Sequence, residues 1–482
     1  MRKRWGQYRK KAAIAAAWMI IWQLAAYLVG NRILLVGPLE TLRTLGEQAI
    51  RGSFWMTVGT SLLRIGAGFI TGLALGLLLA AVSSRFTLAE EVLAPVMALL
   101  KAIPVASFVV LFLIWWRSGV LATAVSFCIV LPNIYVNTLE GIRHMDRRLL
   151  EMARVLRIPA WNRFFYIYRP ALKPYLDSAF RISAGMSWKS GVAAEVIGIP
   201  ALSIGEQLYL SKIYLDTAGV LAWTVVTILA SVASEKVVLA LWGLFQRWEP
   251  GCRTAGEGSR QLQGTEPERE ERRQAAAQTV LELVHVSKSY HGKTVLRDVS
   301  ASYERGKIYY FRSPSGSGKT TLFRLIAGLE SPDSQECGNN RKTEVRDAAD
   351  RAAERNIPAE AAGIKRCGSR ISMVFQEDRL CEEYSALVNV DMVTGNREKS
   401  REHLCQLLEE TDLRRPCREL SGGMKRRVAI ARAMAAGGDV ILLDEPFGGL
   451  DEESRRRTER YIHNYGADSA LLVATHTESC RF

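Results

Sequence analysis

Three short motifs between residues 307 and 445 combine glycines, a lysine, hydroxyls and carboxylates at spacings suited to phosphate chemistry. The first is a strand candidate, KIYYF at 307–311, which runs directly into RSPSGSGKTTLFRLIAGL. Glycines there can bend the backbone around phosphates and aim amide groups inward at a helix start. This pattern predicts nucleotide binding, with Lys319 on the β- and γ-phosphates and the Thr320 hydroxyl on Mg²⁺. The loop comprises Ser313, Pro314, Ser315, Gly316, Ser317, Gly318, Lys319, Thr320 and Thr321, with Ser313 in place of the usual first glycine.

The second motif is VILLDEP at 440–446, a buried-strand run that ends in two carboxylates. Fully buried strands rarely end in acids without a metal or a catalytic purpose. We therefore expect Asp444 to hold Mg²⁺ through water and Glu445 to polarise an attacking water. The third motif, LSGGM, places Ser421, Gly422 and Gly423 before a basic helix, which is another helix N-terminus suited to an anion.

The elements that must position these motifs differ between the two halves of the 482-residue chain. Residues 1–248 hold 26 Lys and Arg against 12 Asp and Glu, a net charge of +14, which is the whole basic excess of the protein. These basic residues flank apolar stretches, so we interpret them as topology signals and expect no nucleic-acid partner. With 48% hydrophobic residues the chain is neither disordered nor collagen-like, and its eight cysteines show no metal-ligand spacing.

The first half predicts an α-helical membrane domain with about six spans. The second predicted span is rich in small residues at Gly66, Gly68, Gly72 and Gly76, which let helices approach closely in lipid. The third contains Lys101 and Pro104, which predicts a broken or bent helix. The predicted spans are residues 12–29, 57–82, 92–116, 119–137, 176–199 and 219–246.

Basic residues set the predicted orientation in the membrane. Residues 1–11 carry six positive charges and no acid, so we expect the N-terminus in the cytoplasm as an uncleaved anchor of a multi-pass inner or plasma membrane protein. Residues 140–175 hold eight Lys and Arg against three acids and would also be cytoplasmic. The sixth span then returns the chain to the cytoplasm. The predicted domains are a membrane domain at 1–248, a flexible linker at 249–279 and an α/β domain at 280–482.

The second half resembles the ATP-binding subunits of ABC transporters, because the phosphate loop, MVFQED, LSGGM, LLDEP, GGLD and LLVATHTES occur in that order. The resemblance implies a P-loop ATPase fold with a small helical subdomain. It implies that Glu445 is the catalytic base, that His476 contacts the γ-phosphate and that Gln376 touches Mg²⁺ and reports to the membrane domain. It also implies that Tyr290 stacks on adenine and that Asp451 lies at a dimer contact. The implied cofactors are ATP and Mg²⁺, with Thr320, Gln376 and Asp444 around the metal.

The first half resembles importer permeases of the nitrate, sulfonate and taurine type over roughly 55–247. The resemblance centres on EMARVLRIPAWNRFFYIYRPALKPY at 151–175, which is similar to the cytoplasmic loop that docks on the ATPase. Glu151 and Ala153 match the start of that loop and Pro170 its end, whereas Arg157 replaces the usual glycine.

Together the two resemblances imply an ATP-driven importer of a small organic solute, and Lys101, Arg181 and Lys189 hint only weakly at an anion. One copy of each motif implies a homodimer, with pairing to another half-transporter left open. An extracytoplasmic solute-binding protein is the other implied partner. Three alternatives are a regulatory or sensory membrane ATPase that moves nothing, an exporter and a P-loop kinase. The 151–175 loop argues against an exporter, and LSGGM upstream of LLDEP argues against a kinase.

Overall fold

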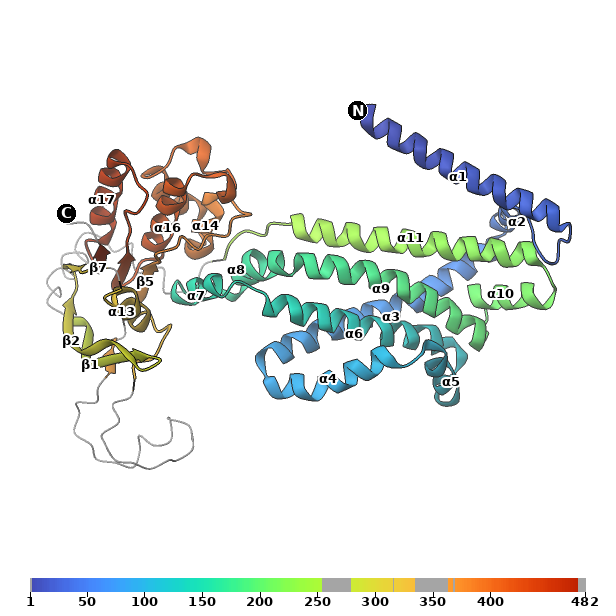
Figure 1. The fold of residues 1–482 in the computed structure, drawn as a ribbon, viewed down its shortest axis with the longest axis horizontal. Helices are drawn as coiled ribbons and strands as arrows, with labels where there is room; N and C mark the ends of the chain where they lie inside the picture. The colour runs from blue at the N-terminus through green and yellow to red at the C-terminus, as the bar shows by residue number, and fades with distance from the viewer. Residues whose placement is uncertain (1, 254–278, 315, 334–362, 367–368, 476–482) are drawn as a thin grey trace, which may run out of the picture. The chain divides into compact units, whose positions relative to one another are not determined.

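The computed structural model describes residues 2–253, 279–314, 316–333, 363–366 and 369–475, and it divides into two compact units (Figure 1). The first unit comprises Met1–Met145 and Pro170–Trp248, and the second comprises Asp146–Arg169 and Glu249–Phe482. Asp146–Arg169 therefore packs with the second unit, although the sequence places it inside the predicted membrane domain. Most of the predicted linker, 254–278, lies outside the described residues.

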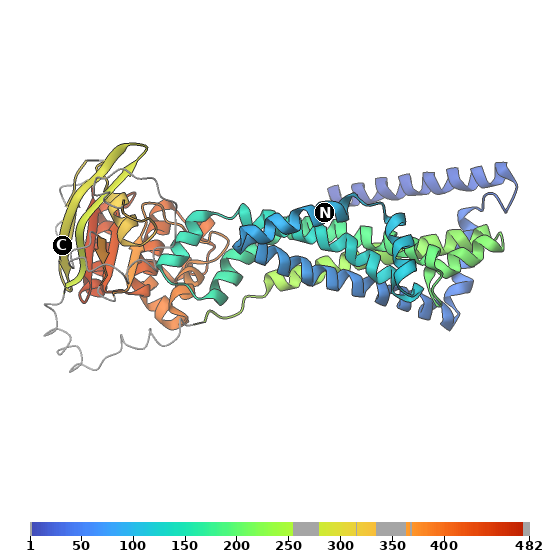
Figure 2. The ribbon, with the colours of Figure 1, turned by 90° about the horizontal axis from the view of Figure 1, so that it is seen from below.

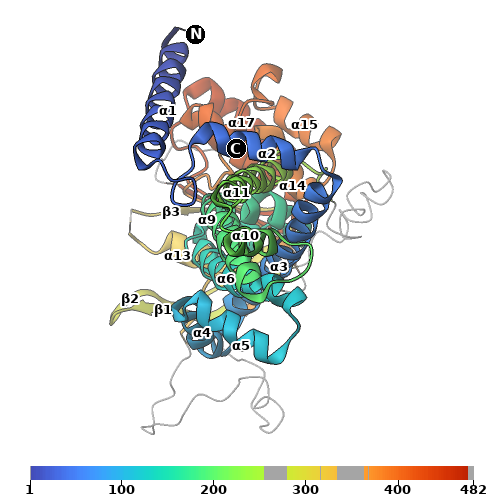
Figure 3. The ribbon, with the colours of Figure 1, turned by 90° about the vertical axis from the view of Figure 1, so that its right-hand side faces the viewer.

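Long helices build the first unit. Figure 3 looks along them and shows α6, α9 and α11 close together, with α4 and α5 on one side. The helices are α1 (Arg2–Val29), α2 (Pro38–Ala49), α3 (Gly52–Arg85), α4 (Thr87–Ala102), α5 (Val105–Trp115), α6 (Ser118–Arg143), α9 (Arg169–Gly198), α10 (Ile204–Ile213) and α11 (Thr217–Arg247).

Three of the described helices, α3, α6 and α11, are long and apolar enough to cross a membrane. A fourth candidate is the pair α4 and α5, which is bent by 103° at Ile103 and Pro104. Proline lacks an amide hydrogen and pushes the preceding residue out of the helical region, and Ile103 is indeed extended with ψ of 126°. The predicted bend in the third span is confirmed. The other two predicted spans lie in α1, whose apolar part is the shorter Ala13–Val29, and in α9, so the count of six remains a prediction.

Three of the four small residues noted in α3 form its contact with α6. A Cβ on Gly68 would lie 2.2 Å from the Thr123 carbonyl oxygen, and Cβ atoms on Gly72 and Gly76 would lie 3.0 Å from side-chain atoms of α6. Gly66 has no atom within 4 Å of that position, so it lies off this contact. A four-residue spacing keeps positions 68, 72 and 76 on one face, and position 66 does not share that phase.

The ionisable residue buried deepest in the first unit is Glu195 of α9, which has no exposed surface. Its Oε2 accepts hydrogen bonds from the Ser61 hydroxyl at 2.8 Å and the Gly205 amide at 3.3 Å. The Arg64 guanidinium lies 3.9 Å from its Oε1. Glu195 is therefore paired inside the unit, as buried charges must be.

Two sheets organise the second unit. The parallel sheet has the order β3-β7-β6-β5, and a second, antiparallel sheet has the order β2-β1-β4. Figure 2 shows β1 and β2, in yellow, as a long curved pair along one side of this unit. The strands are β1 (Thr279–Tyr290), β2 (Lys293–Glu304), β3 (Ile308–Arg312), β4 (Gly363–Lys365), β5 (Ile371–Val374), β6 (Val440–Asp444) and β7 (Ala470–Thr475).

The predicted strand at 307–311 corresponds to β3, and the predicted buried-strand run at 440–446 contains β6, which ends at Asp444. Every residue of β6 is buried, as its unbroken apolar run requires. The helices of this unit are α7 (Arg147–Val155), α8 (Ala160–Arg163), α13 (Lys319–Ile326), α14 (Ala386–Thr394), α15 (Arg397–Cys405), α16 (Gly422–Ala436) and α17 (Glu452–Gly466), with the π-turn η1 (Phe164–Tyr168) and the 3-10 turns η3 (Glu410–Asp412) and η4 (Cys417–Glu419).

Candidate functional site

The predicted phosphate loop connects β3 to α13. Gly316 and Gly318 have φ angles of +82° and +91°, a region that glycine occupies at little cost. A Cβ on Gly318 would also lie 3.1 Å from the Val295 carbonyl oxygen. α13 begins at the next residue, Lys319, so the loop ends at a helix N-terminus whose amides suit an anion.

Polar contacts within the loop hold its shape. The Lys319 ammonium donates hydrogen bonds to the carbonyl oxygens of Ser313 and, at 3.2 Å, of Pro314. Ser313 replaces the usual glycine, and its hydroxyl lies 2.6 Å from that of Ser317. The substitution therefore adds a hydrogen bond across the loop. Ser315 lies outside the described residues.

The three residues predicted around the metal line one cavity of about 520 Å³. Thr320 comes from the first turn of α13, Gln376 follows β5, and Asp444 ends β6. Asp444 is only 1% exposed, and its Oδ2 has no hydrogen-bond partner in the described structure. Burial raises the pKa of this carboxyl, partly opposed by a hydrogen bond from Thr320. A hydroxyl, an amide and a buried carboxylate oxygen are hard donors of the kind that Mg²⁺ prefers, so this set fits the ion.

Glu445 directly follows β6 in a left-handed conformation with φ of +49°. Its amide donates to the Ala474 carbonyl of β7 at 3.0 Å. Arg426 of α16, which is 4% exposed, donates to the carbonyl oxygens of Asp444 and Glu445, both at 2.6 Å. The same guanidinium donates to the Phe375 carbonyl at 2.6 Å. One buried arginine thus holds the backbone of Asp444 and Glu445 against the segment that carries Gln376.

The signature residues begin α16. Ser421 is the N-cap, and its hydroxyl accepts from the Met424 amide at 3.3 Å. A Cβ on Gly423 would lie 3.2 Å from the Gly449 carbonyl, whereas one on Gly422 would meet no atom within 4 Å. Gly423 therefore packs closely on the GGLD segment and Gly422 stays open.

Tyr290 and Asp451 are not among the residues that line this cavity. Tyr290, at the end of β1, is 38% exposed, and its hydroxyl hydrogen-bonds Glu330. Asp451 caps α17 by accepting from the Ser454 amide at 2.7 Å, and that hydrogen bond lowers its pKa. His476 lies outside the described residues, directly after β7.

We call Asp146–Arg169 the docking segment. It packs on the nucleotide-binding elements through Glu151 of α7. This carboxylate accepts from Arg324 of α13, at 3.1 and 3.2 Å, and from Arg379 at 2.8 Å. Burial alone would raise the pKa of Glu151, but the hydrogen bonds and charges of the two arginines outweigh it and leave the pKa below its usual value. Arg324 lies five residues after Lys319, and Arg379 lies three after Gln376. One side chain therefore touches both the phosphate-loop helix and the glutamine segment.

The remaining predicted docking residues have structural roles. Ala153 is buried at 1% exposure, which leaves no room for a larger side chain. Arg157 has a φ of +50°, so arginine adopts here the left-handed turn that glycine adopts more readily. The altered residue thus keeps the turn. Pro170 is the second residue of α9, which continues directly from the π-helical turn η1.

Sequence reasoning missed Arg324, Arg379 and Arg426. In the sequence each is one cation among many, and their partners lie 173, 228 and 18 residues away. Arg426 had one detectable signal, since helical spacing places it on the same face as the apolar Ile430 and Ala433, and all three are buried.

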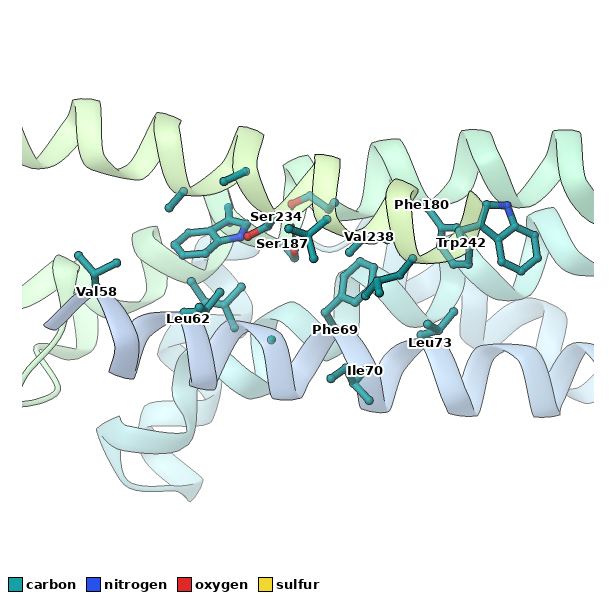
Figure 4. A pocket seen from close by; sticks show the side chains of 18 of the residues that line it. Val58, Leu62, Phe69, Ile70, Leu73, Phe180, Ser187, Ser234, Val238 and Trp242 are labelled. Carbon is teal, nitrogen blue, oxygen red and sulfur yellow. Dashed lines mark hydrogen bonds between the residues drawn. The ribbon is translucent and has the colours of Figure 1, made fainter. Parts of the chain in front are cut away.

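The first unit contains an apolar cavity of about 640 Å³ between α3, α9 and α11 (Figure 4). Phe69, Phe180 and Trp242 line one part of it, and Ser187 and Ser234 contribute hydroxyls. Lys101, Arg181 and Lys189 are not among its lining residues.

Comparison with known proteins matches each unit to a transport component. The profile of the ABC transporter family matches residues 296–448, and that of the binding-protein-dependent transport system inner membrane component matches residues 72–246. The second match includes the docking segment.

Relatives named as import ATP-binding proteins and a solved ATP-binding cassette match about two fifths of the chain. An aliphatic sulfonates import ATP-binding protein of Rhodococcus jostii is 35% identical over 202 residues, covering 41% of this chain and 72% of the relative. An Fe(3+) ions import ATP-binding protein of the same organism is 34% identical, covering 41% of this chain and 55% of the relative. A dimeric ATP-binding cassette solved with ADP and Pi is 28% identical, covering 41% of this chain and 88% of that one, with a TM-score of 0.32. The chain thus belongs to the ABC transporter family and joins an importer-type permease to an ATP-hydrolysing domain in one polypeptide.

Proposed function

We propose that the chain imports a small organic solute of the nitrate, sulfonate and taurine class, with hydrolysis of ATP between two copies of the chain as the driving reaction. The observation that carries this proposal is the position of Glu151. It lies within the stretch that matches the permease family, yet it binds Arg324 and Arg379 next to the phosphate loop and Gln376. A change at the nucleotide thereby reaches the permease through a packed, charged contact.

The residues of the ATPase unit (the second unit) have the following proposed roles. Lys319 and the amides at the start of α13 hold the β- and γ-phosphates. Thr320, Gln376 and Asp444 would hold Mg²⁺, which neutralises developing phosphate charge when bound. Glu445 orients the attacking water and accepts its proton, and Arg426 positions Glu445. His476 contacts the γ-phosphate and Tyr290 stacks on adenine.

Assembly follows from the single copy of each motif. The signature residues Ser421, Gly422 and Gly423 of one chain cover the nucleotide held by the other, with Asp451 at the contact between them. An extracytoplasmic solute-binding protein delivers the solute. The N-terminus and the ATPase unit face the cytoplasm, as the basic residues of 1–11 and 140–175 require.

The solute class rests on the relative named for aliphatic sulfonates import and on the permease resemblance. A relative of similar identity is named for import of Fe(3+) ions, so taurine, ethanesulfonate and nitrate are to be tested against ferric ion.

Uptake into proteoliposomes tests the proposal. The full chain is reconstituted with and without a solute-binding protein, which is to be sought among the products of the neighbouring genes, and labelled solute is followed with and without Mg-ATP. We expect ATP-dependent uptake of an anionic solute that Glu445→Gln abolishes. Hydrolysis without uptake of any of the four solutes would instead favour the regulatory ATPase.

A further inference from the structure

The residues that follow α11, Glu249–Arg253, lie on the docking segment and are named here the linker clamp. α11 ends at Arg247, and the clamp begins two residues later. The Tyr166 hydroxyl of η1 donates to the Pro250 carbonyl oxygen. A purely flexible tether, as the composition predicts for 249–279, needs no such contact.

Asn162 of α8 fixes the far end of the clamp. Its Oδ1 accepts from the Arg253 amide at 2.9 Å, and its Nδ2 donates to the Arg253 carbonyl at 3.0 Å. The same Nδ2 donates to the Met392 carbonyl of α14 at 2.8 Å. Asn162 is fully buried, and its amide oxygen and nitrogen form hydrogen bonds with two backbone segments that are 139 residues apart in the sequence. Loss of this one side chain would leave three backbone groups without that partner.

Two further contacts hold the same five residues. The Arg253 guanidinium lies 3.9 Å from the ring centroid of Trp161, within the range of a cation–π contact. Cys252 lies near the side chains of Tyr166 and Asp391. Burial, with a further contribution from Asp391, raises the pKa of the Cys252 thiol to about 12.

The elements touched by the clamp lead to the signature motif. Asp391 and Met392 belong to α14, which packs on α16, and α16 begins with Ser421, Gly422 and Gly423. The clamp is joined covalently to α11, whereas α8 is joined through η1 to α9. Asn162 therefore binds α14 directly, and it is connected to α9 through η1 and to α11 through the clamp.

We propose that the linker clamp is a second coupling contact, in which Asn162 ties the end of α11 to the docking segment and to α14, so that the signature motif and α11 move together. This inference rests on the proposed transport function and concerns the residues at which the permease chain continues toward the ATPase unit. Asn162 acts as a positioning residue, since it acts through the Arg253 backbone.

Alkylation of Cys252 tests whether the clamp is closed. The full chain in lipid nanodiscs reacts with N-ethylmaleimide at pH 7.5, and mass spectrometry follows the tryptic peptide 248–253. Maleimides react with the thiolate, so a closed clamp keeps Cys252 slow. We expect Asn162→Ala to accelerate its reaction at least about tenfold, with the half-exposed Cys405 unchanged as the internal reference. The exposed Asn464→Ala of α17 is the matched control.

The exposed side chain of Arg253 gives a milder test, because its replacement removes no core packing. Arg253→Ala, in which the tryptic peptide that carries Cys252 becomes 248–260, should accelerate the reaction of Cys252. Arg253→Lys, which keeps both a cation for Trp161 and the cleavage site, should restore slow labelling. Equal rates in wild type, Asn162→Ala and Arg253→Ala would overturn the clamp.

The ratio of solute taken up to ATP hydrolysed tests the coupling role. In the uptake assay described above, we expect Asn162→Ala to bind ATP and hydrolyse it within about twofold of wild type while uptake per ATP falls about fivefold or more. If wild type takes up solute and Asn162→Ala keeps the full ratio despite fast Cys252 labelling, the clamp is not a coupling contact. If wild type hydrolyses ATP but takes up nothing, the transport function fails, and the coupling role of the clamp falls with it.

Discussion

Glu151 carries the most specific claim at the scale of single residues, because two arginines from different segments share its carboxylate. Arg379 also stacks on Phe375, with its guanidinium carbon 3.8 Å from the ring centroid, and its side chain is only 10% exposed. Removal of Glu151 would leave a largely buried cation without this partner, which costs more than the loss of an exposed ion pair.

We predict that Glu151→Gln uncouples the two activities. The amide cannot neutralise Arg324 and Arg379, so solute uptake should fall about tenfold while hydrolysis changes less than about threefold. Parallel uptake and phosphate-release assays measure both. The control is Arg154→Gln, an exposed residue of the same helix, which should change neither. Equal losses of uptake and hydrolysis would show that Glu151 supports the fold and not the coupling.

A second residue-scale prediction concerns the catalytic carboxylate. Glu445→Gln keeps the size of the side chain but removes the proton acceptor, so hydrolysis should fall at least about 100-fold. ATP binding should persist, because the loop at Gly316–Lys319 is untouched. Filter binding of labelled ATP and steady-state phosphate release check these expectations. A hydrolysis rate equal to wild type would remove Glu445 from its proposed role.

His403 of α15 gives the ATPase unit a predicted pH dependence. Its ring nitrogen lies 2.7 Å from the Tyr461 hydroxyl, and burial lowers its pKa to about 4 from an ordinary 6.5. Above pH 6.5 the imidazole is neutral in both the folded and the unfolded chain. Between pH 6.5 and 4 only the unfolded chain takes up the proton. The free energy of unfolding therefore decreases by about 3 kcal/mol as the pH is lowered across that window, and the folded chain becomes less stable.

Thermal unfolding of the full chain at pH 7, 6, 5 and 4.5 measures this dependence. His403→Gln should be less stable at pH 7 and should lose part of the slope. His463→Gln, at an exposed position of α17, should keep the slope of wild type. A wild-type slope that His403→Gln leaves unchanged would assign the acid sensitivity to other groups.

The residues that could be predicted from the sequence are those whose chemistry is local. The loop 313–321 makes its own contacts within a few residues, and Asp444 and Glu445 stand side by side at the end of a buried strand, so residue type and spacing suffice to find them. Arg324, Arg379 and Asn162 bind partners more than 90 residues away. Their roles depend on how the docking segment packs, which no local pattern encodes.

At the scale of elements, the contact between α3 and α6 depends on glycines whose four-residue spacing could be read from the sequence. That spacing separates Gly66 from Gly68, Gly72 and Gly76, but only the packing shows that α6 is the helix that lies against the last three. The break at Pro104 was predictable because proline acts through its own backbone. A docking loop at 151–175 was predicted from the family resemblance alone, because the composition of this stretch differs little from that of its neighbours. In the structure the segment that packs with the second unit is Asp146–Arg169, and the chain returns to the first unit at Pro170.

Alanine substitutions at two glycines of α3 test that contact. Gly68→Ala places a methyl group 2.2 Å from a backbone oxygen, so the helices must separate, at a cost of about 1–3 kcal/mol. Gly66→Ala meets no atom within 4 Å and should be neutral or slightly stabilising, because alanine favours the helix. Thermal aggregation midpoints of the detergent-solubilised variants compare them. Equal midpoints for both variants would contradict the close packing of α3 on α6.

At the scale of the whole molecule, charge and motif count decide the architecture. The net charge of +14 lies in residues 1–248, where it flanks apolar helices, and residues 280–482 are nearly neutral with 32 basic and 31 acidic residues. One chain supplies one phosphate loop, one signature motif and one permease. Because the signature motif is proposed to cover nucleotide held by another chain, the active unit must contain two copies.

The mass of the particle that hydrolyses ATP tests this claim most directly. The full chain in lipid nanodiscs is weighed by mass photometry with and without saturating Mg-ATP, using Glu445→Gln to hold the nucleotide, while phosphate release is followed for wild type. The account predicts two 53.6 kDa chains per disc with ATP, and no hydrolysis from discs that hold one. Single chains that hydrolyse Mg-ATP at the full wild-type rate would contradict it.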